Sequence, residues 1–436
     1  MQSLRPFFAF ILLTVLAASS GCRRDSSGSG DPPPPDNSAG PAVDAPDDES
    51  KIAALEAGGF RFTTDTNGAV RKAAFFTNEP AAELLLNLDG IPNVQELVMS
   101  GPGITDDGMD VLAELQQLKR IDLSGSAIGD ATVATLSKLP NVEVLFLRKT
   151  SVSDDGLAAV ANLAKVRAID LRNTNVGDAG AAHLAKLPRL ADVQLEKTVV
   201  TDAGVAAIAS LPLKSVNLNA CTSISDAAMK SLANTTTLSS LQVDNTRISD
   251  EGMAAAANWQ NLKRLGIRFN DVTGAGIRYL AELPNVERLE LRDSSLDDEG
   301  MEVIAALPKM NFLDIRECRS VTLDGFKLIG KLKSLKYLSV METDFDDEAL
   351  SAIADLQQLD ELNLGATTVS DESLETLLKF QTLTNLNVSG TLLEDDSFRA
   401  LAQLPNLVHL DVSNTSIGFD VVDEIREANP NLNLVE

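Results

Sequence analysis

Aromatic residues are scarce in this sequence. They make up 4% of its 436 residues, although 44% of the residues are hydrophobic. A core of this composition consists mainly of leucine, valine, isoleucine and alanine. Large irregular cores draw much of their stability from buried aromatic rings. The composition therefore favours many small, similar layers over the two or three globular domains that the length alone would suggest.

Histidine and cysteine are also rare. The two histidines, His183 and His409, have no nucleophile or metal-ligand set at a spacing that would join them. The three cysteines, Cys22, Cys221 and Cys318, are too few for a disulfide framework in a protein of this size. We therefore expect no catalytic residues, no metal site and no cofactor, and a protein that is not an enzyme.

Positive charge is in short supply as well. Lysine and arginine number 37 against 63 aspartates and glutamates, so the formal net charge is −26 and the isoelectric point is near 4.4. A chain this acidic repels nucleic-acid phosphates and anionic lipid surfaces. We expect no nucleic-acid partner, and no membrane contact except through a covalent anchor.

The first 22 residues have the pattern of an export signal. Arg5 precedes an apolar run, Phe7 to Ala18, whose twelve residues are too few to cross a bilayer, which needs about 20. Small residues and Cys22 follow. The segment thus resembles a bacterial lipoprotein signal, in which the cysteine is lipidated and becomes the mature N-terminus, although Ser19 stands where leucine is usual. The resemblance implies a lipid anchor at the bacterial cell envelope. Ordinary cleavage near residues 18–20, giving a secreted protein, is the alternative.

Residues 23–50 consist largely of serine, glycine, proline, aspartate and asparagine, and include the run Pro32 to Pro35. Such a segment buries too little apolar surface to fold, and its prolines stiffen it. We expect a disordered tether that leads into a folded domain at residues 51–436.

From Val70 onward the pattern LxxLxL recurs at a nearly constant interval. Its first apolar position is occupied by Val70, Val94, Leu118, Val142, Val166, Leu190, Leu213, Leu238, Leu262, Val286, Met310, Leu335, Leu359, Leu383 and Leu407. The steps are of 24 residues, apart from one of 23 at Leu190–Leu213 and two of 25. This period predicts an α/β solenoid of about fifteen repeats, a horseshoe with a concave parallel β-sheet and convex helices. Residues 51–69 are expected to cap it, and residues 430–436 to form a partial last repeat.

A polar turn opens the second half of each repeat, as in Thr201-Asp202-Ala203-Gly204. Its side-chain oxygens suit the N-terminus of the helix that follows. Acidic pairs at this place, such as Asp106-Asp107 and Asp346-Asp347, lack the spaced oxygen ligands of a calcium loop, so we interpret them as caps too. Three positions interrupt the aspartate series: Gly274, Leu323 and Phe419.

The order of strand, Ser/Thr-Asp-x-Gly turn and helix resembles the leucine-rich repeats. In detail it is similar to the cysteine-containing subtype of F-box proteins and to repeat lipoproteins of bacterial cell envelopes. The resemblance covers about residues 51–436 and implies a binding role without naming a ligand. Cys221 and Cys318 take a position that other repeats fill with threonine, so we expect buried ladder residues. Trp259 and Phe380 take a leucine position of the helix and are expected in the core.

The candidate binding residues follow from strand alternation, because every second side chain points to the concave face. One outward column of the sheet contains Arg268, Arg292 and Arg316, and another contains Arg264, Arg288, Phe312 and Tyr337. Arginine and aromatic residues are common at binding hot spots. Arg148 and Arg172 beside Phe146 form a weaker second candidate.

Glu290 and Asp314 lie in the column between the arginines, so the cluster could equally be a self-neutralising ladder of ion pairs. The sequence thus predicts a non-catalytic recognition module that binds a protein or an anionic envelope polymer through its concave sheet. A structural spacer without a discrete ligand is the alternative.

Overall fold

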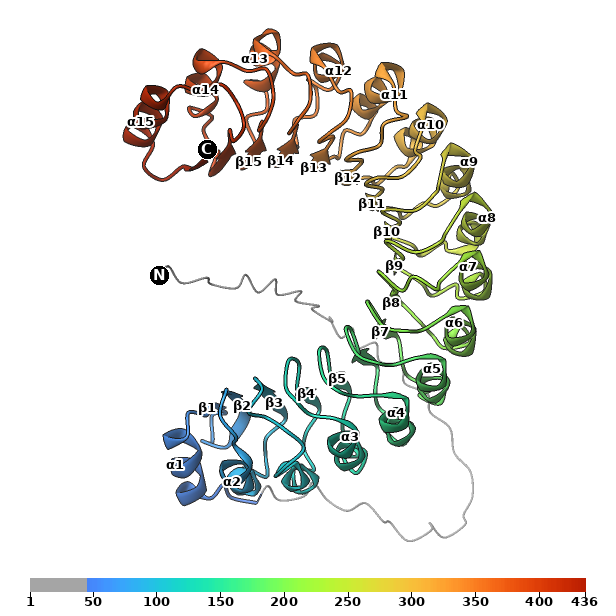
Figure 1. The fold of residues 1–436 in the computed structure, drawn as a ribbon, viewed down its shortest axis with the longest axis vertical. Helices are drawn as coiled ribbons and strands as arrows, with labels where there is room; N and C mark the ends of the chain where they lie inside the picture. The colour runs from blue at the N-terminus through green and yellow to red at the C-terminus, as the bar shows by residue number, and fades with distance from the viewer. Residues whose placement is uncertain (1–44) are drawn as a thin grey trace, which may run out of the picture. The chain divides into compact units, whose positions relative to one another are not determined.

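The computed structural model describes residues 45–436, which form one unit. Its strands line the inner side of an open arc and its helices line the outer side (Figure 1). The predicted α/β solenoid is thus confirmed. Cys22, the export signal and most of the expected tether lie outside the described residues.

Within residues 45–436, seventeen strands form one sheet. They are β1 (Arg61–Thr64), β2 (Val70–Phe76), β3 (Glu96–Ser100), β4 (Arg120–Asp122), β5 (Val144–Phe146), β6 (Ala168–Asp170), β7 (Asp192–Gln194), β8 (Ser215–Asn217), β9 (Ser240–Gln242), β10 (Arg264–Gly266), β11 (Arg288–Glu290), β12 (Phe312–Asp314), β13 (Tyr337–Ser339), β14 (Glu361–Asn363), β15 (Asn385–Asn387), β16 (His409–Asp411) and β17 (Asn433–Val435). From β2 onward each strand pairs in parallel with the strand of the next repeat, whereas β1 pairs antiparallel with β2.

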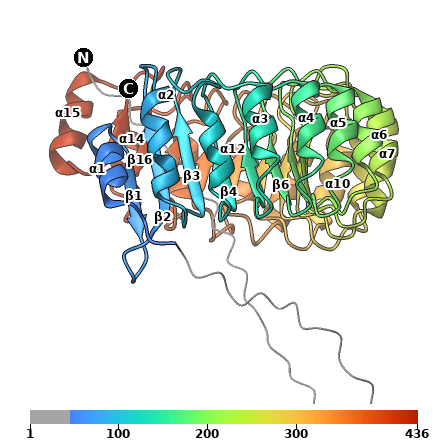
Figure 2. The same cartoon turned by 90° about the horizontal axis from the view of Figure 1, so that it is seen from below.

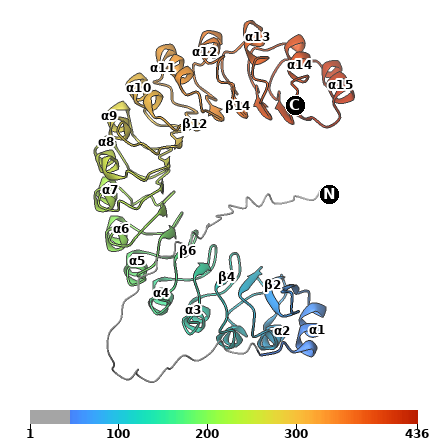
Figure 3. The same ribbon diagram turned by 180° about the vertical axis from the view of Figure 1, so that it is seen from behind.

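The outer layer consists of short helices. The α-helices are α1 (Glu49–Ala57), α2 (Ala82–Leu85), α3 (Asp130–Leu136), α4 (Asp154–Val160), α5 (Asp178–Leu184), α6 (Asp202–Ile208), α7 (Asp226–Leu232), α8 (Asp250–Met253), α9 (Gly274–Ile277), α10 (Asp298–Ala306), α11 (Leu323–Leu328), α12 (Asp347–Ala352), α13 (Leu374–Leu377), α14 (Asp395–Leu401) and α15 (Phe419–Ala428). The 3₁₀ helices are η1 (Leu86–Gly90), η2 (Met109–Glu114), η3 (Ala254–Asn258), η4 (Arg278–Leu280), η5 (Ile329–Lys331) and η6 (Asp371–Ser373). Figures 2 and 3 show the helices side by side along the outer surface.

The folded unit begins before residue 51, which corrects the predicted end of the tether. Helix α1 starts at Glu49, and the Asp48 side chain caps it by accepting from the backbone N–H of Ser50. Asp47 accepts from the backbone N–H of Val70 at 2.6 Å. The last residues of the polar segment are therefore ordered because they satisfy backbone donors of the first repeat.

The core is an aliphatic stack, as the composition predicts. Trp259 and Phe380 are fully buried, and the Trp259 indole N–H donates to the backbone carbonyl of Leu232. Cys221 and Cys318 are buried free thiols, as expected. The Cys318 thiol lies 3.2 Å from the carbonyl oxygen of Leu291, in the preceding repeat. A ladder threonine such as Thr174 instead donates to Leu171 of its own repeat, so the two side chains satisfy different carbonyls.

The aspartates at the helix N-termini cap mainly the next repeat rather than their own. Asp178, the first residue of α5, accepts at 2.8 Å from the backbone N–H of Thr201 and at 2.9 Å from that of Gly204, both at the start of α6. Thr201 in turn caps α6 through the backbone N–H of Ala203. Equivalent links run from Asp106, Asp130, Asp154, Asp202, Asp226, Asp250, Asp298, Asp347, Asp371 and Asp395 to the following repeat.

The aspartate series is interrupted at Gly274 and Leu323, and the next repeat compensates in both cases. After Gly274 the N-cap residue is Asp297, whose carboxylate accepts from the backbone N–H of Gly300 in its own helix. After Leu323 the N-cap is Asp346, which accepts from Ala349 in the same way. A repeat that receives no carboxylate from its predecessor thus supplies one itself.

Candidate recognition site

The predicted concave residues come together on strands β10 to β13. The parallel register aligns Arg264, Arg288, Phe312 and Tyr337 in one row across the sheet. A second row, Gly266, Glu290, Asp314 and Ser339, runs beside it. Arg268, Arg292 and Arg316 follow where the strands end. We call Arg264, Arg268, Arg288, Arg292 and Arg316 the arginine cluster.

Two buried carboxylates organise this cluster from below. Glu290 has no exposed side-chain surface and accepts ion pairs from Arg264 at 2.8 Å and from Arg268 at 2.6 Å, and a further one from Arg288. Asp314 is equally buried and pairs with Arg316 at 2.7 Å and with Arg268 at 3.3 Å. Each arginine side chain in these pairs is between 23% and 35% exposed, so the guanidinium groups lie above the acids at the surface.

Gly266 leaves space for this convergence. It lies between Arg264 and Arg268 on β10, and a Cβ atom there would lie 3.0 Å from the Asp244 carboxylate. Because no side chain fills the position, Arg264 on β10 and Arg268 just after it both reach Glu290 on the neighbouring strand. The missing side chain could be read from the sequence, because Gly266 occupies the same column as Glu290.

Aromatic rings extend the cluster along the sheet. The Arg288 guanidinium lies 3.3 Å from the centroid of the Phe312 ring, and Phe312 stacks on Tyr337 with centroids 3.8 Å apart. Arg292 lies over Phe269 at 5.3 Å and pairs with Glu317. Such contacts fix the arginine planes before any ligand arrives, which lowers the entropic cost of binding.

Burial changes the proton affinity of several groups here. It raises the pKa of Asp244, which lies 3.8 Å from Arg268, to about 6. Burial also raises the pKa of Tyr337 and lowers that of Arg264, whereas the hydrogen bonds that Arg316 donates to Asp314 raise the pKa of Arg316. Asp244 and Glu317 were not among the predicted site residues, although Asp244 stands in the outward column of Arg268.

The second candidate site, Arg148 and Arg172 beside Phe146, does not form a single cluster. Arg172 forms a two-point ion pair with Asp170 on its own strand, at 2.6 and 2.9 Å. The cation over Phe146 is Arg120, not Arg148 or Arg172. The predicted trio is therefore not assembled as one group.

The arginine cluster has features of both interpretations of the sequence, the binding site and the self-neutralising ladder of ion pairs. Every arginine has a carboxylate within 4 Å, as the self-neutralising ladder requires. The acids are nevertheless at the floor and the guanidiniums and rings above them, so a partner meets cations and aromatic surface first. Within residues 45–436 no group of histidine, cysteine and acidic side chains could hold a metal ion. In the same part of the chain, no helix is long and apolar enough to span a bilayer.

Comparison with known proteins agrees with the fold. The family described as "Leucine Rich repeat" matches residues 282–305 and 331–354. An internalin from Listeria monocytogenes has a similar structure, with a TM-score of 0.57 and 21% identity over 84% of this chain and 94% of that one. A leucine-rich-repeat protein from Leptospira interrogans gives 0.54 and 18%, over 80% and 92% of the two chains. No curated protein sequence matches significantly. These matches support the leucine-rich-repeat assignment and confirm the fold class.

Proposed function

We propose that this leucine-rich-repeat solenoid is a non-catalytic recognition module, and that its arginine cluster with Phe312 and Tyr337 binds an acidic segment of a partner protein. The proposal rests on the layered arrangement on β10 to β13, in which buried carboxylates hold guanidinium groups in place at the surface. Leucine-rich-repeat proteins usually bind proteins, and this role fits the concave face.

The charge distribution supports an acidic ligand. Five guanidiniums lie against four carboxylates, those of Glu290, Asp314, Glu317 and Asp244, so the cluster keeps a small positive excess in a chain of net charge −26. The stacked rings of Phe312 and Tyr337 add apolar area beside the cations. Charged and aromatic anchors in the centre of a concave surface are the usual composition of a binding hot spot.

The test must avoid residues that stabilise the sheet. Reversing Arg268 looks attractive from the sequence, but its guanidinium contacts both buried acids, so a glutamate there would oppose them. Arg292→Gln with Tyr337→Ser is a better variant, because Arg292 pairs with Glu317 and Tyr337 stacks on Phe312, so neither side chain pairs with the buried acids. The probe is a synthetic peptide of alternating glutamate and tyrosine, measured by calorimetry at low salt. We expect the double variant to bind about tenfold to thirtyfold more weakly, the loss of one or two hot-spot contacts.

Arg148→Gln is the matched control, since Arg148 holds the same outward position on the strand-end column of β5. It should bind the peptide as the unaltered protein does. If the double variant keeps full affinity, the arginine cluster is not the site. If dextran sulfate binds there more tightly than the peptide, the ligand is the anionic envelope polymer instead. If neither binds, the cluster is an internal ion-pair ladder and a spacer role is favoured.

The same proposal includes export and anchoring. We propose that a lipid on Cys22 holds the protein at the bacterial cell envelope. We also propose that its repeats belong to the cysteine-containing subtype, on account of Cys221 and Cys318. A Cys22→Ser variant should lose radiolabelled palmitate and leave the membrane fraction. If it fractionates with membranes as before, the lipid anchor is wrong and secretion or another attachment replaces it.

A further inference from the structure

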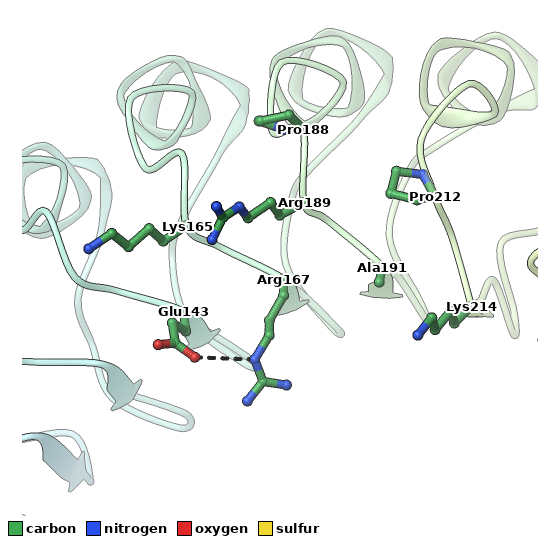
Figure 4. A pocket seen from close by; sticks show the side chains of 8 residues that line it. All are labelled: Glu143, Lys165, Arg167, Pro188, Arg189, Ala191, Pro212 and Lys214. Atoms are coloured by element: carbon green, nitrogen blue, oxygen red, sulfur yellow. Dashed lines mark hydrogen bonds and ion pairs between the residues drawn. The ribbon is translucent and has the colours of Figure 1, made fainter. Parts of the chain in front are cut away.

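A second group of cations lies away from the concave face, at the edge where the helices lead into strands β6 to β8. It lines a pocket of about 510 Å³ formed by Glu143, Lys165, Arg167, Pro188, Arg189, Ala191, Pro212 and Lys214, which we call the edge pocket. Figure 4 shows its side chains coming from consecutive helix-to-strand connections.

The pocket lies where cations replace an asparagine that some other repeats carry. In those repeats the residue before the first apolar position of the LxxLxL pattern is asparagine, and its side-chain N–H donates at 2.9 Å to a carbonyl of the preceding repeat. Asn141, Asn261, Asn285 and Asn406 do so. Two successive repeats carry Lys165 and Arg189 at this position instead.

The next repeat lacks the position altogether. It is the one unit with a 23-residue step, and Pro212 is followed directly by Leu213. Its turn closes from the backbone N–H of Leu213 to the carbonyl of Leu211, two residues back, whereas the turn at Leu190 reaches three residues back to Leu187. The missing residue leaves the hollow between Arg189 and Lys214 unfilled.

The cations of the edge pocket have almost no internal counter-charge. Arg167 pairs with Glu143 at 3.4 Å, with both side chains well exposed. The Lys165 ammonium donates to the neutral amide of Asn141. Among the described residues, the side chains of Arg189 and Lys214 have neither a hydrogen bond nor an ion pair. The positive potential here is therefore not cancelled locally, in contrast to the arginine cluster.

The lining also indicates what kind of anion fits. Pro188, Pro212 and Ala191 add apolar surface between the cations, and the two prolines offer no backbone N–H to a peptide. The cations come from three consecutive repeats, spaced at about 5 Å as the strands are. This arrangement matches a ligand with apolar ring faces and regularly repeated negative groups better than a single small ion.

We propose that the edge pocket binds a short stretch of an acidic polysaccharide. Its sugar rings pack on Pro188 and Pro212, and its carboxylate, phosphate or sulfate groups contact Arg189, Lys214, Lys165 and Arg167. The proposal is independent of the protein-binding function of the concave face, because it involves other residues and another ligand.

The experiment compares two double charge reversals in the full-length protein. Arg189→Glu with Lys214→Glu alters the pocket. Lys309→Glu with Lys263→Glu alters the same two positions in other repeats, where the Lys309 ammonium bonds to the Asn285 amide and Lys263 pairs with Glu287. The probes are dextran sulfate oligosaccharide, uncharged dextran of equal length and polyglutamate, titrated at two salt concentrations.

We expect dextran sulfate to bind, uncharged dextran not to bind, and the pocket variant to be at least about tenfold weaker than the control variant. Arg189→Gln with Lys214→Gln should show a smaller loss in the same direction, which guards against misfolding of the reversed variant. Equal binding by pocket and control variants would overturn the proposal. Polyglutamate binding as tightly as dextran sulfate would overturn its polysaccharide part. Loss in the Arg292→Gln, Tyr337→Ser variant instead would assign the polymer to the concave face.

Discussion

The arginine cluster and the edge pocket place cations of the same kind in opposite surroundings. On β10 to β12 the arginines lie over Glu290 and Asp314, which are fully buried, and their planes are fixed by ion pairs and by Phe312. At the edge of β6 to β8 the cations project from connections, and only Arg167 has an acidic partner. In the arginine cluster the side chains are held in fixed positions and most of their charge is neutralised by acids. In the edge pocket most of the cations lack an acidic partner, and fewer contacts fix their positions. We infer that specificity for a folded or segmented partner belongs to the first and attraction of a polymer to the second.

The largest expected difference comes from removing one carboxylate in each region. Glu290→Gln leaves three arginines without their shared buried counter-charge, so we expect the free energy of unfolding to fall by about 3–5 kcal/mol. Glu143→Gln is the same substitution at the exposed edge and should change it by less than about 0.5 kcal/mol. Urea denaturation of both variants measures this. Equal effects would mean that the buried acids do not organise the concave face.

A smaller effect is expected from Asp244, whose pKa burial raises to about 6. The folded protein then binds this proton more tightly than the unfolded chain, where aspartate titrates near 3.9. Stability therefore falls as the pH rises from about 4 to about 6, and the cost persists at neutral pH. Asp244→Asn keeps an oxygen for the backbone N–H of Arg268, so we expect it to stabilise the protein by about 1–2 kcal/mol at pH 7.5 and far less at pH 4.

Asp411→Asn, on β16 away from the cluster, corrects for the general loss of one negative charge. Should Asp244→Asn have the same effect at both pH values, burial of its carboxylate is not what matters. Acidic probes should also bind the arginine cluster more tightly below pH 6 than above it in the unaltered protein, because protonation of Asp244 removes a competing negative charge.

The smallest effect is expected at Cys318, which is buried in the connection after β12. Burial raises the pKa of its thiol to about 11, so the folded protein should resist thiol reagents and react only after denaturation. An added thiol in the edge pocket, Arg189→Cys, should react within minutes in the native state. Cys318→Thr should cost less than about 1 kcal/mol, because other repeats use threonine there. Rapid labelling of Cys318 in the native protein would mean that the connection after β12 is readily exposed to solvent.

Periodicity explains why most of the fold could be predicted. A constant step fixes which residues share a column, so the alignment of Arg264, Arg288, Phe312 and Tyr337 follows from the sequence alone. Contacts between columns are harder to predict from the sequence, because they depend on side-chain length and on the space around each side chain. That Glu290 collects three arginines follows from the gap at Gly266, which the repeat pattern does not describe.

Two predictions show what periodicity misses. The repeat pattern predicts that the aspartates cap the helices that they begin, whereas most of their side chains accept from backbone N–H groups of the next repeat. The repeat pattern places a helix after each polar turn without fixing its type, and after Gly108 that helix is η2, a 3₁₀ helix with a period of three residues. The edge pocket was not predicted, although the 23-residue step that opens it was visible in the sequence.

The cap aspartates also give the solenoid a direction. Each of them serves the repeat that comes after it in the chain, so a repeat that folds after its N-terminal neighbour meets a carboxylate that is already in position. Removing repeats from the C-terminus leaves every remaining helix with its carboxylate acceptor, whereas a cut on the N-terminal side removes the carboxylate from the next helix and leaves at most the hydroxyl of its own N-cap residue, such as Thr201. Asp297 and Asp346 are the exceptions, because each caps its own helix. The chain can therefore be divided before α10 or before α12 without orphaning a helix start, and those are the joints at which such a protein can lose or gain repeats at least cost.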